Sequence, residues 1–169
     1  EHSDRLSEME FNFTMRSFSA RGLKEIFGSA PSYGRAVYER IGRDETETEG
    51  MMKGFIDLVF RSGDRYYIAD WKSNSLGASS SDYSAARMEV EMTRHNYFLQ
   101  YYLYTVALHR YLSLRLGKGY SYGRNFGGIF YLFVRGMTGG NASPGIFHDM
   151  PDEDTVMRLD RFFRGEAGL

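Results

Sequence analysis

Hydrophobic and polar positions alternate near the start of the chain, which is the period of a half-buried β-strand. Four apolar side chains carry this alternation over residues 9–18: Met9, Phe11, Phe13 and Met15. Two further segments rich in β-forming residues, 53–61 and 65–73, are separated by residues 62–64, which include Gly63. A short turn with a glycine between two such segments predicts a β-hairpin.

Apolar residues recur at helical spacing over residues 85–116, a stretch without Gly or Pro. This pattern predicts one long helix that ends at Gly117. Residues 127–134 form a continuous apolar run, which is typical of an interior strand covered on both faces. Shorter helices are expected over residues 32–41 and 153–163. The order of strand, hairpin, long helix, buried strand and helix predicts an α/β sandwich with a mixed sheet.

A length of 169 residues suits one domain, residues 1–169. Because the chain has no cysteine, disulfides, thiolate zinc sites and cysteine nucleophiles are excluded, and any metal must take oxygen or imidazole ligands. No segment approaches the roughly 18 apolar residues of a membrane span, and no signal peptide is visible, so we expect a cytoplasmic protein without a membrane partner. The first residue is Glu1 rather than Met, which indicates a piece of a longer protein.

The net charge of −1 gives no global electrostatic reason to expect a nucleic-acid partner. The distribution of charge is uneven, however, because residues 87–135 carry seven Arg or Lys against two Glu. A nucleic-acid binding face and an ordinary solvated surface account for this segment equally well.

Three charged residues on the predicted hairpin are the strongest sign of chemistry. Asp57 lies within the apolar run 55–60, where an ionised carboxylate loses several kcal/mol of hydration unless a cation or hydrogen-bond donors replace the water. Asp70 and Lys72 stand two residues apart on the next strand and share one face, while Trp71 points to the other. Two converging carboxylates favour a hard divalent cation, Mg²⁺ or Mn²⁺. The alternative is a buried salt bridge between aspartate and lysine.

The spacing of Asp57, Asp70 and Lys72 resembles the motif of the PD-(D/E)xK nuclease superfamily. Longer segments resemble the carboxy-terminal nuclease domain of the RecB family, and the resemblance spans most of the chain from Ser7 onward. The segments are Lys53-Gly-Phe-Ile-Asp-Leu-Val-Phe-Arg61, Asp70-Trp-Lys-Ser-Asn-Ser-Leu-Gly77, Leu99-Gln-Tyr-Tyr-Leu-Tyr-Thr-Val-Ala-Leu-His-Arg-Tyr-Leu112 and Phe126-Gly-Gly-Ile-Phe-Tyr-Leu-Phe-Val-Arg-Gly136. The resemblance implies a restriction-endonuclease-like sandwich, in which helices flank a central mixed sheet.

The resemblance also implies cleavage of DNA phosphodiester bonds with Mg²⁺, or with Mn²⁺ in its place. Asp57 and Asp70 would be metal ligands, and the Trp71 carbonyl a further one. In the family an acidic residue on the preceding element completes the site. We assign this role to Glu10, with Glu8 on the same strand as the other candidate.

Lys72 is expected to orient the attacking water and to stabilise charge on the phosphate, because an ammonium beside two carboxylates holds its proton. Gln100 and Tyr104 lie four residues apart and therefore on one face of the predicted helix, together with Tyr97. The family has a matching Gln-x-x-x-Tyr motif beside its active site, which implies that Gln100 and Tyr104 bind substrate or water. The alternative, ordinary packing of a tyrosine-rich helix, is the better interpretation for Tyr97 and for Tyr101, Tyr102 and Tyr111.

The family protein is a helicase–nuclease, but the present sequence has no Gly-x-x-x-x-Gly-Lys-Ser/Thr loop for an ATP phosphate. The resemblance therefore implies a nuclease fragment of a longer bacterial chain, and it places the family's metal-binding histidine before Glu1. It further implies RecC-like and RecD-like partner subunits and a role in processing DNA ends during recombination repair. A second hypothesis is a non-catalytic module of the same fold that docks DNA or another subunit.

Overall fold

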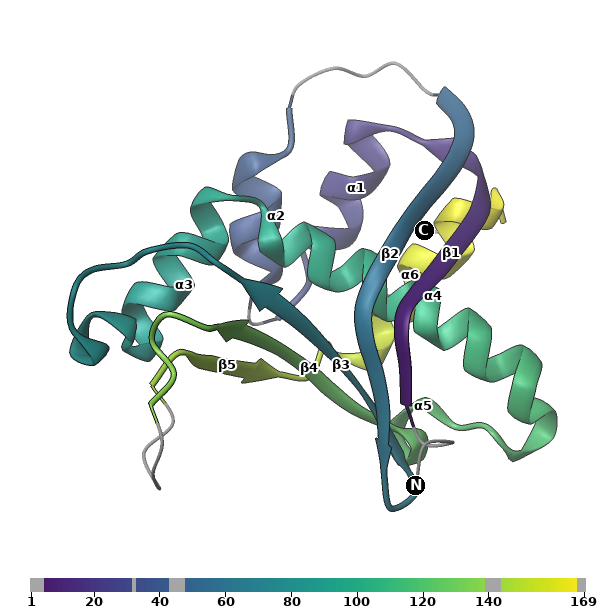
Figure 1. Cartoon of the computed structure of the whole chain (residues 1–169). Helices are drawn as coiled ribbons and strands as arrows, with labels where there is room; N and C mark the ends of the chain where they lie inside the picture. The colour runs from purple at the N-terminus through teal and green to yellow at the C-terminus, as the bar shows by residue number, and fades with distance from the viewer. Residues whose placement is uncertain (1–4, 32, 43–47, 139–143, 167–169) are drawn as a thin grey trace.

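The computed structural model describes residues 5–31, 33–42, 48–138 and 144–166. Five strands form one sheet in the order of the chain (Figure 1). Adjacent strands are antiparallel except for the third and fourth, which are parallel. The expected α/β fold with a mixed sheet flanked by helices is confirmed. The strands are β1 (Arg5–Phe18), β2 (Thr48–Ser62), β3 (Arg65–Lys72), β4 (Phe126–Phe133) and β5 (Ile146–Asp149).

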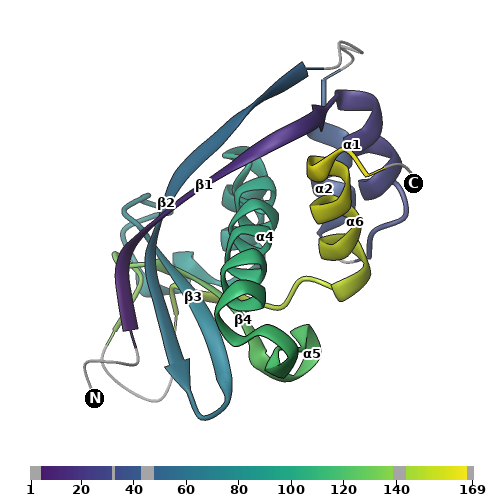
Figure 2. The same ribbon diagram turned by 90° about the vertical axis from the view of Figure 1, so that its right-hand side faces the viewer.

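Helices gather on the concave face of the sheet, where β1 and β2 curve over α4 (Figure 2). The two longest helices are α4 (Tyr97–Leu116) and α6 (Glu153–Arg164), and both pack against β1. The other helices are α1 (Ala20–Phe27), α2 (Gly34–Arg40), α3 (Ala85–Arg94) and the short α5 (Tyr122–Asn125), with 3₁₀ turns at Ser80–Tyr83 and Gly117–Gly119. In the part of the chain that the structure describes, none of the helices has the length and apolar character needed to cross a membrane.

The hairpin predicted from the sequence is confirmed as β2 and β3. Its turn places Gly63 at a φ of 59°, a backbone conformation that costs glycine little and other residues more. The pairing of Ser62 with Arg65 closes the ladder next to this turn. The turn sets the register of β2 against β3, and this register determines where Asp57 and Asp70 lie relative to each other.

The single long helix expected over residues 85–116 is wrong, because the chain breaks into α3 and α4. Asn96 stands between them at φ 58° and ψ 27°, a left-handed conformation that asparagine tolerates better than most residues. The Asn96 side chain also accepts a hydrogen bond from Arg40 on α2. The absence of Gly and Pro was therefore insufficient evidence for an unbroken helix. The predicted end of the helix at Gly117 is confirmed by its φ of 55°.

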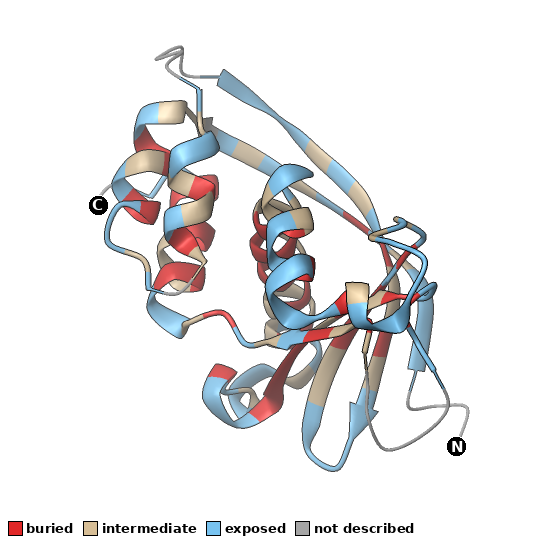
Figure 3. Cartoon of the chain, turned by 90° about the vertical axis from the view of Figure 1, so that its left-hand side faces the viewer, coloured by how far each residue is buried: buried red, intermediate tan, exposed pale blue. Residues whose placement is uncertain are grey.

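The expectation that β4 is covered on both faces is also wrong. Ile129, Tyr131 and Phe133 are fully buried beneath the helices, whereas Phe130 and Leu132 on the opposite face are only half-buried. Aromatic stacking across the strands shields this second face in part, since the ring centroids of Phe130 and His148 lie 4.2 Å apart. Figure 3 marks buried residues in the central strands of the sheet and in the helices beside them. A continuous apolar run does not by itself reveal how many faces are covered.

Several short elements were not predicted, α1 and β5 among them. One helix was expected between the first two strands, and the structure has both α1 and α2 there. In α1 only Leu23, Ile26 and Phe27 supply the buried apolar stripe. Strand β5 has four residues and pairs with β4 at the sheet edge. Runs this short carry little periodicity, so tertiary packing determines their conformation.

A buried ion pair fastens α6 to α4. Arg110 on α4 contacts the carboxylate of Asp160 on α6, and their side chains are only 15% and 10% exposed. Arg164 donates a second hydrogen bond to Asp160 at 2.9 Å. The Arg110 guanidinium also lies 4.3 Å from the centre of the Phe13 ring on β1. Arg110 belongs to the basic segment 87–135 noted in the sequence, but its charge is paired with Asp160 within the fold.

We expect Asp160→Ala to lower the free energy of unfolding by about 3–5 kcal/mol, because it leaves the Arg110 charge buried without its partner. Urea unfolding followed by circular dichroism measures this loss. Glu25→Ala is the control, since its ion pair with Arg21 is exposed and should be worth at most about 1 kcal/mol. Equal losses in the two variants would contradict the structural role assigned to Asp160.

Candidate active site

The strands β2 and β3 part at the point where Asp57 occurs. Their last paired residues in this direction are Leu58 and Ala69. Beyond that pair, the backbone N–H of Trp71 donates a hydrogen bond of 2.9 Å to Oδ2 of Asp57. The carboxylate of Asp57 thus takes the place that a backbone carbonyl would have in a continuing ladder. The Asp57 carboxylate is therefore held by the main-chain N–H of Trp71 and not by a flexible side chain.

The neighbouring part of β2 departs from regular alternation. Ile56 and Val59 are both fully buried although they stand three residues apart. In a regular strand, residues an odd number apart lie on opposite faces, so the alternation of β2 is interrupted between these two residues. On β1, Glu8 lies opposite Asp57, because its neighbours Ser7 and Met9 pair with Leu58 and Ile56. Glu8 has a φ of 51°, which is unusual for a residue with a side chain. The irregularity of both strands therefore coincides with the candidate site.

Asp70 and Lys72 are buried on the helix-facing side of β3, as the period of two predicted, and the intervening Trp71 is 50% exposed on the other side. The ammonium Nζ of Lys72 lies 2.6 Å from Oδ2 of Asp70. At this distance the ammonium pairs with the carboxylate and donates a hydrogen bond to it. Burial raises the pKa of Asp70; Lys72 lowers it, and the Asp57 carboxylate raises it further.

Lys72 is enclosed by groups from two other elements. Its ammonium donates a hydrogen bond of 3.0 Å to Oε1 of Gln100 on α4. The same nitrogen lies 3.8 Å from the centre of the Tyr97 ring and 5.1 Å from that of Tyr131. The hydrogen bond and the cation–π contacts stabilise the buried ammonium of Lys72. Tyr97 therefore contacts the site, although the sequence favoured simple packing for it.

Tyr131 is a site residue that the sequence analysis missed. It pairs with Asp70 across the parallel strands β3 and β4, and its hydroxyl donates a hydrogen bond of 3.2 Å to Oε1 of Gln100. The hydroxyl also lies 3.1 Å from the backbone carbonyl of Tyr97. The available signal was a polar-tipped side chain in an otherwise apolar run. The register that aligns it with Asp70 required the structure.

Gln100 and Tyr104 share one face of α4, as expected from their spacing. Since an ammonium can only donate, Lys72 fixes the amide oxygen of Gln100 toward itself and leaves the amide nitrogen to donate to the Tyr104 hydroxyl at 2.9 Å. Burial, together with the Asp70 and Asp57 carboxylates, raises the pKa of Tyr104 to about 12. Tyr104 is therefore a neutral phenol near pH 7. Within the described residues, no acceptor binds its hydroxyl proton, which leaves it for a ligand.

The structure places Glu10 apart from this group of contacts. Glu10 pairs with Phe55 in the β1–β2 register, and its carboxylate forms an ion pair of 2.7 Å with Lys53. Over the described ranges, the His, Asp and Glu side chains form no cluster of three that could hold a metal ion. The role of Glu10 as a third acidic ligand stays a prediction, and it requires that the carboxylate leave Lys53.

The residues that are brought together suit a hard divalent cation with two carboxylate ligands. Asp70 is buried beside Lys72, and Asp57 is close enough to raise the pKa of Asp70. Carboxylate oxygens are preferred ligands of Mg²⁺ and Mn²⁺. A cation would relieve the repulsion between the two carboxylates. The donor set therefore fits the metal proposed from the sequence.

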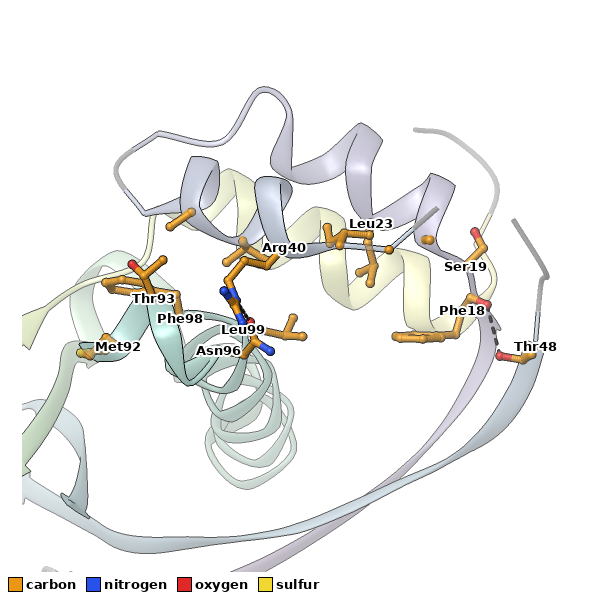
Figure 4. A pocket seen from close by; sticks show the side chains of 15 residues that line it. Phe18, Ser19, Leu23, Arg40, Thr48, Met92, Thr93, Asn96, Phe98 and Leu99 are labelled. Atoms are coloured by element: carbon orange, nitrogen blue, oxygen red, sulfur yellow. Dashed lines mark hydrogen bonds between the residues drawn. The ribbon is translucent and has the colours of Figure 1, made fainter. Parts of the chain in front are cut away.

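One large cavity among the described residues does not coincide with this site. It has a volume of about 430 Å³ and lies among α1, α2, α4 and the adjoining ends of β1 and β2. Figure 4 shows its apolar side chains, Leu23 and Leu99 among them, with Arg40 and Asn96 at one side. It contains none of the acidic or basic residues assigned to catalysis. Volume alone is thus a poor guide to the chemistry of this protein.

Comparison with known proteins shows similarity to RecB subunits. The chain is 47% identical to RecB, a subunit of the RecBCD enzyme, from Escherichia coli over 119 residues, which are 70% of the chain and 10% of that protein. The corresponding RecB of Mycolicibacterium smegmatis is 33% identical over 191 aligned positions, covering 97% of the chain and 17% of that protein. The chain belongs to the RecB family. A third RecB subunit, from Haemophilus influenzae, is 46% identical over 69% of the chain and 10% of that protein.

The chain therefore spans about a tenth to a sixth of the length of these RecB relatives. No family model matches it. RecB membership accounts for the segments singled out in the sequence, and the structure adds how those segments meet. The hairpin supplies the two aspartates and the lysine, while α4 supplies the glutamine and tyrosines that surround the lysine.

We expect Gln100→Leu to slow DNA cleavage by about 10- to 100-fold, because the amide that orients both Lys72 and Tyr104 is lost. Initial rates on linear DNA with saturating Mg²⁺ provide the measurement. Glu25→Ala on α1 is the control, because its ion pair with Arg21 is exposed. A Gln100→Leu rate within twofold of the unmodified chain would contradict a positioning role.

Proposed function

We propose that this chain is a Mg²⁺-dependent deoxyribonuclease domain of the PD-(D/E)xK type, which hydrolyses DNA phosphodiester bonds. The observation that carries the proposal is the convergence of buried Asp70 with Lys72, at 2.6 Å, and with Asp57, whose carboxylate raises the pKa of Asp70. A purely structural salt bridge would need only one carboxylate beside Lys72, whereas here a second carboxylate lies close to the first. Membership of the RecB family supports the same function.

Asp57 and Asp70 would hold the metal through their carboxylates, with the Trp71 carbonyl and Glu10 as further ligands. When bound, the metal would supply Lewis-acid stabilisation of the phosphate and a lower pKa for an attached water. Asp57 is kept in place by the Trp71 N–H, so the ligand geometry depends on the backbone of β3. Trp71 itself points away from the site, and its side chain is not required for metal binding.

The remaining residues act on water and phosphate. The water oxygen forms a bond to phosphorus, the bond to one ester oxygen breaks, and the products are a phosphomonoester end and a hydroxyl end. Lys72 would orient the water and offset the negative charge that develops on the phosphoryl oxygens. Gln100 and Tyr97 hold Lys72 in position, and the neutral Tyr104 hydroxyl can donate a hydrogen bond to the phosphate.

The test is degradation of linear single- and double-stranded DNA by the chain without ATP, in Mg²⁺ or in EDTA. The proposal expects cleavage with Mg²⁺ and none with EDTA. No cleavage of either substrate by folded protein at a high ratio of protein to DNA would overturn it. That result would favour the second hypothesis, a module that docks DNA or another subunit.

The wider role that we propose is processing of DNA ends at double-strand breaks in recombination repair, in the bacterial cytoplasm. The chain would act within a longer RecB subunit together with RecC-like and RecD-like subunits. The named RecB relatives are subunits of RecBCD enzymes, which supports this assembly. Helicase activity would then reside in parts of the longer protein other than this chain.

A further inference from the structure

A second cavity, of about 290 Å³, lies where the far end of α4 meets β1, β2 and β3. Its wall differs in chemistry from that of the larger apolar cavity, because it combines arginines with aromatic rings. None of its residues belongs to the candidate active site. The lining residues that matter here are Arg5, Arg61, Arg115, Tyr66, Tyr111 and Phe60.

The three arginines come from three different elements and converge on one small space. Arg115 is exposed near the end of α4, and the Arg61 side chain on β2 is 43% exposed. Arg61 is held by a hydrogen bond to the Gly63 carbonyl at 2.8 Å, while its contact with Asp64, at 3.5 Å, is to a carboxylate 87% exposed to solvent. Such a pair is screened and weak. In a chain of net charge −1, this is a local concentration of positive charge.

The aromatic part of the wall is half-buried and therefore fixed in place. Tyr66 on β3 lies beneath the Arg61 guanidinium, which is 5.9 Å from the ring centre. Tyr111 on α4 contributes a second ring to the lining. Guanidinium groups that bind phosphate, beside rings on which a base can stack, are the usual components of a site for single-stranded nucleic acid.

The cavity is aligned with the candidate active site along two elements. On α4, Gln100, Tyr104, Tyr111 and Arg115 follow the i, i+4, i+11, i+15 spacing of one helix face. Tyr111 is therefore about 10 Å beyond Tyr104 at 1.5 Å per residue. On β2, Arg61 is about 13 Å beyond Asp57 at the rise of an extended strand. Both elements lead from the acidic residues to the same cavity.

We propose that this cavity binds one unpaired nucleotide of single-stranded DNA a short distance along the strand from the bond that is cut. The arginines bind its phosphates, and a base stacks on Tyr66 or Tyr111. The proposal rests on the nuclease function above and adds a nucleotide-binding cavity separate from the catalytic residues. A paired base could not enter, because it remains stacked within its duplex.

The test measures binding in EDTA, so that it does not depend on cleavage. Fluorescence anisotropy of fluorescein-labelled oligothymidylate is recorded at several salt concentrations with the unmodified chain, Arg61→Gln, Arg115→Gln and Tyr111→Leu. Each arginine variant should weaken binding and reduce the slope of log affinity against log salt by roughly 0.7. Tyr111→Leu should weaken binding about fivefold or more without changing the slope.

Arg21→Gln is the matched control, since it removes one exposed positive charge on α1, remote in sequence from the cavity. It should leave affinity, salt slope and cleavage unchanged. Arg115→Lys should restore the slope that Arg115→Gln loses. A labelled blunt duplex should show no effect of Tyr111→Leu.

Affinities and salt slopes of the three cavity variants that equal those of Arg21→Gln would overturn the proposal, whether or not the chain cuts DNA. An equal effect of Tyr111→Leu on duplex and single strand would overturn it as well. Failure of the nuclease proposal is recognised separately, by the absence of cleavage with Mg²⁺ in protein that still binds oligothymidylate.

Discussion

Asp70→Asn is expected to reduce Mg²⁺-dependent DNA cleavage by about a thousandfold or more. The substitution keeps the shape of the side chain and removes the charge that would bind the cation, whose stabilisation of the transition state is worth several kcal/mol. Asp70 is only 3% exposed, and burial disfavours its charged form, so that loss of the charge costs the fold little. An asparagine oxygen can still accept a hydrogen bond from Lys72. The loss should therefore come from chemistry and not from unfolding.

Cleavage rates of unmodified and variant chains on linear DNA, with thermal unfolding measured in parallel, provide the check. The variant should melt within a few degrees of the unmodified chain. Asp154→Asn on the exposed side of α6 is the control, because its carboxylate is 76% exposed and far in sequence from the hairpin. Cleavage by Asp70→Asn at more than a tenth of the normal rate would contradict the role of Asp70.

Lys72→Gln is expected to slow cleavage by about 10²- to 10³-fold, the range found when one group that stabilises transition-state charge is removed. It should leave Mg²⁺ binding intact, since a positive charge beside the metal ligands is removed rather than added. Glutamine can still donate to Gln100 but carries no charge to offset that of the phosphate. The expected signature is a lower kcat with an unchanged Mg²⁺ requirement.

Single-turnover rates over a range of Mg²⁺ concentrations measure both quantities for Lys72→Gln. A half-saturating Mg²⁺ concentration within about threefold of normal, together with the reduced rate, is the predicted result. Weaker Mg²⁺ binding with a normal maximal rate would show that Lys72 acts by arranging the carboxylates and not by stabilising the phosphate.

Much of the site could be predicted from the hairpin alone. Alternation along β3 places Asp70 and Lys72 on the buried face and Trp71 on the exposed one, and a short turn leaves few ways to align Asp57 with them. Helical periodicity likewise places Gln100 and Tyr104 together on α4. These inferences depend on local geometry, which the sequence specifies well.

Other features depended on contacts between distant segments. Tyr131 meets Gln100 because β4 runs parallel to β3 in one particular register, and no local pattern specifies that register. The ion pair of Glu10 with Lys53 depends on the pairing of β1 with β2 across the intervening helices. The break at Asn96 was hidden because asparagine is compatible both with a helix and with a left-handed turn.

The central claim is that Asp57 and Asp70 form a divalent-cation site, and direct binding of Mn²⁺ tests it most simply. Electron paramagnetic resonance counts the free Mn²⁺ during titration of the unmodified chain and of a variant carrying both Asp57→Asn and Asp70→Asn. We predict saturable binding to the unmodified chain, competition by Mg²⁺, and loss of that binding in the folded double variant. Equal Mn²⁺ binding by the two proteins would contradict the claim.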